Sequence, residues 1–154
     1  GVPYGLTNRP VAHAYLNMPA TDAGPLPKLL SQTGAFQDVP TLSPANDLLA
    51  YGVNTPLWSD GAVKTRWMAI PNAGPPYTPE SQVSFAPTGE WSFPNGSVFV
   101  KHFELVTDAA HPEVRRRLET RLLVRDSSGA VYGDTEKWRP DNTDADLLTD
   151  HLTE

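Results

Sequence analysis

The sequence predicts an all-β domain, an antiparallel β-sandwich of jelly-roll type with long proline- and glycine-rich loops and little helix. Three observations support this prediction. Proline and glycine supply 16 and 11 of the 154 residues, more than in average proteins. The prolines spaced through residues 1–55 prevent any long helix there. Short runs with strand alternation then recur between turn sequences, as in sandwiches and barrels.

The composition limits the function. A chain of 154 residues fits one domain that can bury roughly 70% of its unfolded surface. A formal net charge of −6 argues against nucleic-acid binding, which needs a basic footprint. No apolar run approaches the roughly 20 residues of a membrane span, so we expect no membrane insertion. Because cysteine is absent, disulfides, thiolate metal sites and c-type haem attachment are excluded within this chain.

The first third of the chain has few strand signals. Residues 1–25 are expected to form an extended segment or linker, before a domain that spans residues 26–148 and a C-terminal tail over 149–154. Leu26–Gly34 is the one helix candidate, a turn or two ended by glycine. The sequence shows no basic segment followed by an apolar one, so a signal peptide is expected outside these residues.

The first predicted strands follow from local alternation and turn residues. Residues 65–70 form a short strand ended by Pro71. Pro94-Asn95-Gly96 is a strong turn sequence, and a strand over 97–106 follows it. Alternation divides this strand into two faces: Phe99, Phe103 and Leu105 lie on one and Val98, Val100 and His102 on the other.

A hairpin is predicted next. Residues 118–125 alternate, with Leu118, Thr120, Leu122 and Val124 on one face. Asp126-Ser127-Ser128-Gly129 then turns the chain into a strand over 130–132. Leu122 is expected to point into the core. Residues 134–154 are rich in acids and are expected to wrap the sheet as a loop.

The four tryptophans are the first candidates for ligand binding. Sugar-binding sandwiches use exposed indoles with nearby acids and amides, although an indole beside a strand is more often buried. Ser59 to Gly61 reads as a turn between Trp58 and the following strand. We predict that Trp58 or Trp138 is exposed, whereas Trp67 and Trp91 are buried. The candidate ligand-binding residues are Trp58, Asp60, Lys64, Arg121 and Trp138.

Two charged segments each leave two interpretations open. Arg115–Arg117, with Arg121 and Arg125, forms either a partner-docking face or a set of ion pairs with Glu119. The acidic run 141–146 offers Asp141, Asp144 and Asp146 as calcium ligands. Alternatively, Asp141 and Thr143 bond local backbone amides in an Asx-type turn.

The sequence contains no motif that supports nucleophilic catalysis. The sequence has no G-x-S-x-G elbow, phosphate-binding loop or paired histidines at metal-ligand spacing. The enzymatic alternative is a metal-dependent domain, a hydrolase or oxidase, that would use Asp60, His102, Asp141 and Asp144.

An ordered set of motifs resembles a known domain family. The set comprises L-S-Q-T-G-A-F at 30–36, Y-G-V-N-T-P-L-W-S-D-G-A-V-K-T-R-W at 51–67, W-S-F-P-N-G-S-V-F-V-K-H-F at 91–103, R-L-E-T-R-L-L-V-R at 117–125 and W-R-P-D-N-T-D-A at 138–145. It is similar to a domain of secreted bacterial multidomain redox proteins. There the domain stands next to a sugar-dehydrogenase-like propeller, a c-type cytochrome domain, or both.

This resemblance implies an extracytoplasmic setting and a haem-carrying neighbour, but no activity. The chain lacks C-x-x-C-H, so the haem is expected beyond residue 154 or on another chain. We therefore expect a non-catalytic accessory domain that binds a polysaccharide or docks redox modules. The alternatives are the metal-dependent enzyme domain and a purely structural spacer.

Overall fold

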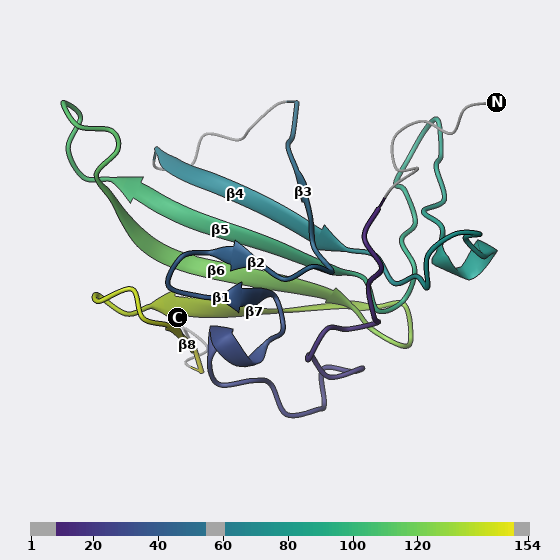
Figure 1. Cartoon of the computed structure of the whole chain (residues 1–154). Coiled ribbons are helices and arrows are strands. Elements are labelled where there is room, and N and C mark those ends of the chain that lie inside the picture. Colours follow the sequence, from purple (N-terminus) through teal and green to yellow (C-terminus); the bar gives the residue numbers. More distant parts are fainter. Residues whose placement is uncertain (1–8, 55–60, 150–154) are drawn as a thin grey trace.

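A six-stranded antiparallel sheet dominates the structure (Figure 1). The computed structural model describes residues 9–54 and 61–149. The strands lie in sequential order: β3 (Leu49–Tyr51), β4 (Ala62–Ala69), β5 (Val98–Val106), β6 (Arg115–Arg125), β7 (Val131–Trp138) and β8 (Ala145–Leu147). A second sheet pairs β1 (Phe36–Asp38) with β2 (Ser43–Pro44), and two 3-10 turns are η1 (Leu30–Gln32) and η2 (Pro79–Ser81).

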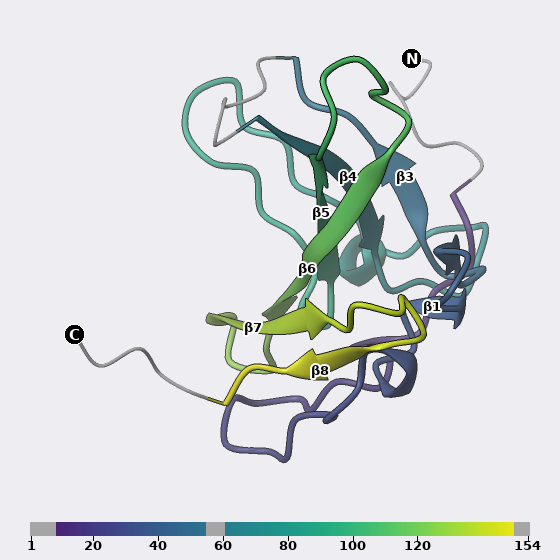
Figure 2. The same cartoon turned by 90° about the vertical axis from the view of Figure 1, so that its left-hand side faces the viewer.

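The N-terminal third of the chain covers one face of the large sheet, which we call the inner face. In Figures 1 and 2, β1 and the chain around it lie on this side of the sheet, and η1 lies beside the edge strand β8. The core between the two layers combines inward side chains of the sheet with residues of the covering chain; its larger members are Leu16, Met18, Leu30, Phe36, Trp67, Val100, Leu122 and Trp138. Phe36 of β1 packs edge-on against Trp67 of β4, with ring centroids 5.3 Å apart.

The all-β antiparallel fold is confirmed. Its second layer is a two-stranded sheet with irregular chain, and the strands of the large sheet follow one another in sequence. A jelly roll instead joins non-neighbouring strands through Greek-key connections. The jelly-roll arrangement is therefore not confirmed, although the predicted scarcity of helix agrees with the two short 3-10 turns of the described chain.

Most of the predicted strands match the structure. β6 contains its predicted run, and β4 and β5 match theirs except for one residue at one end of each. The turn before β5 has Gly96 at a φ of +87°, a backbone conformation that glycine adopts without strain. Gly129 ends the predicted turn after β6 in the same way. Leu122 is fully buried, which confirms the assignment of its face.

The loop predicted from residue 134 onward is wrong. The structure continues β7 to Trp138 and adds β8 as an edge strand. The cause is the pair Asp134 and Glu136, which occupy inward positions of β7 where alternation calls for apolar residues. Because two acids occupy core positions, the sequence here lacks the alternation of apolar and polar residues that indicates a strand.

The helix expected over 26–34 is reduced to η1, and Gly34 follows it with a φ of +81°. Part of the segment expected as a linker belongs to the domain. Ala12, Leu16 and Met18 are buried in the core, and the main chain of Ala12 pairs with that of Asn72. Apolar residues spaced through a proline-rich stretch thus anchor the covering layer.

Candidate functional site

Most cations of this acidic protein lie on the outer face of the large sheet, the face turned away from β1 and β2. Strand alternation and pairing place them there: Lys64, Arg66, Lys101, Arg116, Arg121, Arg125 and Lys137. Along β4 to β7, which the structure describes completely, Glu119 is the one acid on this face. We call these seven cations the cationic face, which contrasts with the net charge of −6.

Three cations form a row across adjacent strands at the centre of this face. Arg66 of β4 is the direct partner of Lys101 in β5, and Lys101 is the direct partner of Arg121 in β6. Side chains at such positions start only about 5 Å apart, and like charges there repel. Partial burial is the larger cause that lowers the pKa of Lys101, and the charges of Arg66, Lys64 and Arg121 lower it further.

Phe103 supports two members of the row. The Lys101 ammonium lies 5.1 Å and the Arg121 guanidinium 4.9 Å from its ring centroid, within the range of cation–π attraction. The ring is buried, so it positions charges and offers no open surface for stacking. This arrangement gives the row a defined geometry.

Ion pairing within the sheet accounts for only part of this charge. Arg121 forms a 2.5 Å ion pair with Glu119 two residues earlier on the same strand, as one of the sequence alternatives proposed. One carboxylate neutralises one cation. Glu119 therefore cannot compensate the whole row.

Aliphatic side chains border the cations. Leu123 and Val131 are exposed on the same face, since Leu123 follows Arg121 by two residues and Val131 is the partner of Arg125. The cationic face therefore combines charges with an apolar margin, a mixture typical of protein interfaces.

The candidate ligand-binding residues predicted from the sequence divide into three groups. Lys64 and Arg121 lie on the cationic face, on β4 and β6. Trp58 and Asp60 fall in residues 55–60, outside the described residues. Trp138 lies on the inner face with 5% of its surface exposed, so it is not a stacking platform; of the predicted alternatives, exposure of Trp58 or of Trp138, only that of Trp58 is left, outside the described residues.

Trp138 is buried because it completes a polar network on the inner face. Its indole N–H donates to the Thr120 hydroxyl over 2.9 Å, and that oxygen lies 2.8 Å from Nδ1 of His102. Because the Glu104 carboxylate only accepts, Nε2–H donates to it over 3.1 Å. In the neutral imidazole Nδ1 is then the acceptor, so the Thr120 hydroxyl donates to Nδ1. Burial, the largest influence, lowers the pKa of His102, although Glu104 opposes it.

Two further sequence predictions concern tryptophan exposure. Trp67 is buried, as predicted. Trp91 is 54% exposed, so the prediction that it is buried is wrong. The reason is its place in the long β4–β5 connection rather than in a strand of the sheet.

The carboxylates of the calcium candidate bond to protein donors. Asp141 accepts from the main-chain N–H and the hydroxyl of Thr143, the Asx-type turn of the sequence alternative. Asp144 accepts from the main-chain N–H and hydroxyl of Ser31 at 3.1 and 2.6 Å. Asp146 forms a bidentate pair with Arg139. Within residues 9–54 and 61–149, no three potential ligands cluster around a common point.

The described members of the proposed catalytic set do not face one another. His102 bonds to Thr120 and Glu104, whereas Asp141 and Asp144 bond within the turn before β8 and to the η1 segment. The fourth member, Asp60, lies outside the described residues. The arrangement thus offers no support for a hydrolytic centre.

Sequence reasoning missed Arg66, Lys101 and Phe103. The alternating Lys64-x-Arg66 is visible in the sequence, but the central row exists only because the register brings three strands into alignment. The buried acids of β7 were missed for another reason: single acids in an acidic segment look solvated.

Glu136 is fully buried, and both its carboxylate oxygens are without a hydrogen-bond partner in the described chain. Burial, with smaller contributions from Asp134, Asp144 and Asp146, raises its pKa to about 8. Burial also raises the pKa of Asp134 to about 6, against its backbone hydrogen bonds. Glu136 is therefore mainly protonated at neutral pH.

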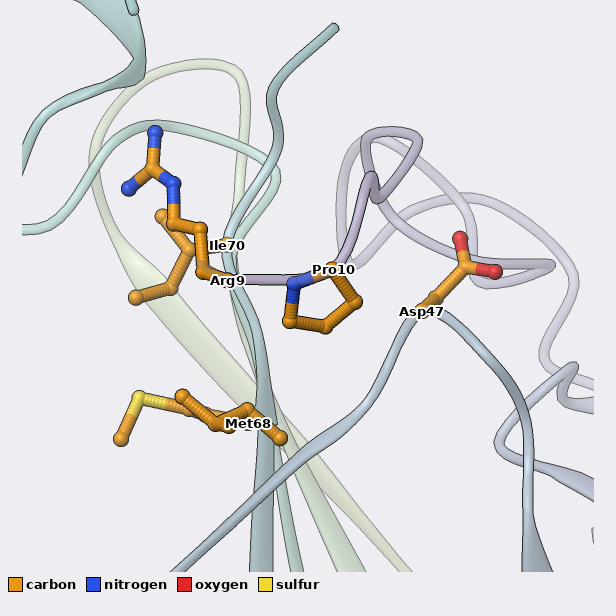
Figure 3. Close-up of a pocket in the computed structure, with 6 residues that line it drawn as sticks. Arg9, Pro10, Asp47, Met68 and Ile70 are labelled. Atoms are coloured by element: carbon orange, nitrogen blue, oxygen red, sulfur yellow. The ribbon is translucent and has the colours of Figure 1, made fainter. Parts of the chain in front are cut away.

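A small pocket lies at one end of the sheet, between Arg9, Pro10, Asp47, Leu49, Met68 and Ile70 (Figure 3). Its volume of about 10 Å³ accommodates at most about one water molecule. The Arg9 guanidinium lies 4.3 Å from the ring centroid of Tyr77, and Figure 3 shows it directed away from Met68. This pocket is too small for a substrate.

Comparison with family models, with curated proteins and with solved structures finds no match to this chain. In the described part of the chain, no helix is long and apolar enough to span a membrane.

Proposed function

We propose that this domain is a non-catalytic accessory domain of an exported redox protein, and that its cationic face docks an acidic protein module. The partner class is a c-type cytochrome or dehydrogenase domain, and the setting is extracytoplasmic, as the motif resemblance implies. The observation that carries the proposal is the row of Arg66, Lys101 and Arg121. Three aligned cations, two of them over the Phe103 ring, are difficult to explain by stability alone, because like charges in register are destabilising.

The shape and chemistry of the face favour a protein partner over a polysaccharide. Neutral sugars need an open aromatic face, but Phe103 is covered by its two cations. The exposed Leu123 and Val131 add aliphatic surface, which sugars use poorly and protein interfaces bury. Complementary charge would steer an acidic module to this face and accelerate association.

The proposal can be tested by titrating an acidic c-type cytochrome with the purified domain at 50 and 300 mM salt. We expect salt-sensitive binding that Arg121→Glu weakens at least tenfold, which corresponds to about 1.4 kcal/mol. Leu123→Ser should weaken binding at both salt concentrations, because it removes apolar contact.

Lys28→Glu is the matched control, since it makes the same change in charge at an exposed position that β6, β7 and β8 separate from Lys101. Equal losses for the Arg121 and Lys28 variants would contradict a localised docking face. Polygalacturonate serves as a second probe. If it binds more tightly than the cytochrome and Leu123→Ser has no effect on it, the occupant is an anionic polysaccharide and the docking proposal fails.

A further inference from the structure

The connection between β4 and β5 contains a small hairpin that displays two aromatic rings. Ser84 and Ser92 exchange both main-chain hydrogen bonds, at 2.8 and 3.0 Å. Phe85 and Trp91 occupy the next pair, where side chains leave on the opposite side from the serines and lie close together. Figures 1 and 2 show this connection as a teal loop that stands away from the large sheet.

The two rings are exposed and contact each other. Phe85 is 68% exposed and Trp91 is 54% exposed, with ring centroids 5.2 Å apart and planes at 73°. By contrast, Trp67 and Trp138 are buried in the core. Exposing a large apolar side chain forgoes its burial energy, so a pair of exposed rings indicates a binding surface.

We propose that Phe85 and Trp91 bind a neutral polysaccharide, at a surface separate from the cationic face and independent of its proposed function. Edge-to-face contact leaves ring faces open, and the flat C–H face of a sugar can stack on the indole. Two exposed polar residues of the turn between the rings, Thr88 and Glu90, suit the hydroxyl groups of a sugar.

The small size and the charge of the hairpin favour a neutral polysaccharide over a protein or an anionic polymer. A protein interface needs roughly 800 Å² from each partner, far more than the tip of one short hairpin offers. A polysaccharide chain is narrow enough to contact two rings. Residues 82–94, which carry the two rings, contain Glu90 but neither lysine nor arginine, so the hairpin itself offers no cation to an anionic polymer.

Affinity electrophoresis of the whole chain tests the proposal, with hydroxyethylcellulose, xylan, galactomannan and a β-1,3-glucan as separate gel additives. We expect at least one polymer to retard the wild type. The double variant Phe85→Ala, Trp91→Ala should lose at least fivefold of that retardation, whereas Trp91→Phe should keep part of it. Leu123→Ala, an exposed apolar residue of the outer face, is the control and should migrate as the wild type does.

Two results would overturn the proposal. One is the absence of retardation by all four polymers. The other is equal retardation of the wild type and the double variant, with thermal unfolding showing that both are folded. Polygalacturonate separates this surface from the cationic face, because any binding to it should respond to Arg121→Glu and not to Trp91→Ala.

Discussion

Replacement of Glu136 by glutamine should make the protein more resistant to alkaline pH. The carboxyl group is fully buried, and its pKa of about 8 lies above the ordinary value of 4.5. The folded state therefore favours the protonated form. This contribution is fully present below pH 4.5, declines as the pH rises, and is lost once the pH passes about 8.

The magnitude follows from the difference between these two pKa values. One pKa unit corresponds to about 1.4 kcal/mol, so the wild type loses about 4 kcal/mol of this contribution between pH 5 and pH 9. Glutamine has nearly the same shape and does not ionise. The variant should have a stability similar to that of the wild type at pH 5 and exceed it by several kcal/mol at pH 9.

Urea unfolding at pH 5, 7 and 9 measures this difference. Glu90→Gln changes an exposed acid and should show the same pH dependence as the wild type. Asp134 adds its own slope in all three proteins, because its pKa is raised to about 6. A stability difference between Glu136→Gln and wild type that changes by less than 1 kcal/mol from pH 5 to 9 would refute the assignment of Glu136 as a buried, ionisable core residue.

Three further predictions concern stability. Leu122→Ala should cost about 2–5 kcal/mol in chemical denaturation, because the side chain is fully buried; Leu123→Ala, at an exposed neighbour, should cost less than about 0.5 kcal/mol, and the reverse order would mean that the sheet faces are exchanged. Thr120→Val should cost about 1–3 kcal/mol, because it removes the acceptor of the Trp138 indole, and an unchanged midpoint would contradict this network. Excess chelator should leave the melting temperature unchanged, because the Asp144 carboxylate already bonds to Ser31; a fall of several degrees that Asp144→Ala abolishes would establish a calcium site.

The parts of the fold predicted from sequence are those that obey local rules. β5 and the hairpin of β6 with the start of β7 follow alternation and turn residues, and both are present. The predicted strand over 130–132 is shorter than β7, and β8 was not predicted, because Asp134 and Glu136 occupy core positions. The covering layer was missed because its core contacts come from isolated residues such as Leu16 and Met18, which follow no regular period.

The candidate site depended on information that single residues do not contain. Lys64 and Arg121 were predicted from their surroundings, but the row that joins Arg121 to Lys101 and Arg66 arises from strand register. Trp91 was predicted to be buried and is exposed, and Trp138, one of the two tryptophans proposed as exposed, is buried. Trp138 is buried because its indole bonds to the buried Thr120 hydroxyl. Trp91 is exposed because it lies in a protruding hairpin and not in a strand of the large sheet.

Zero-length carbodiimide cross-linking tests the docking proposal most directly, because it joins a lysine amine to a carboxylate in contact with it. Of the chain's four lysines, Lys64, Lys101 and Lys137 lie on the cationic face and Lys28 lies beyond β8. With the cytochrome partner, we predict that mass spectrometry will find intermolecular links at Lys101 and its neighbours on that face. Links that are as frequent at Lys28, or confined to it, would contradict the account.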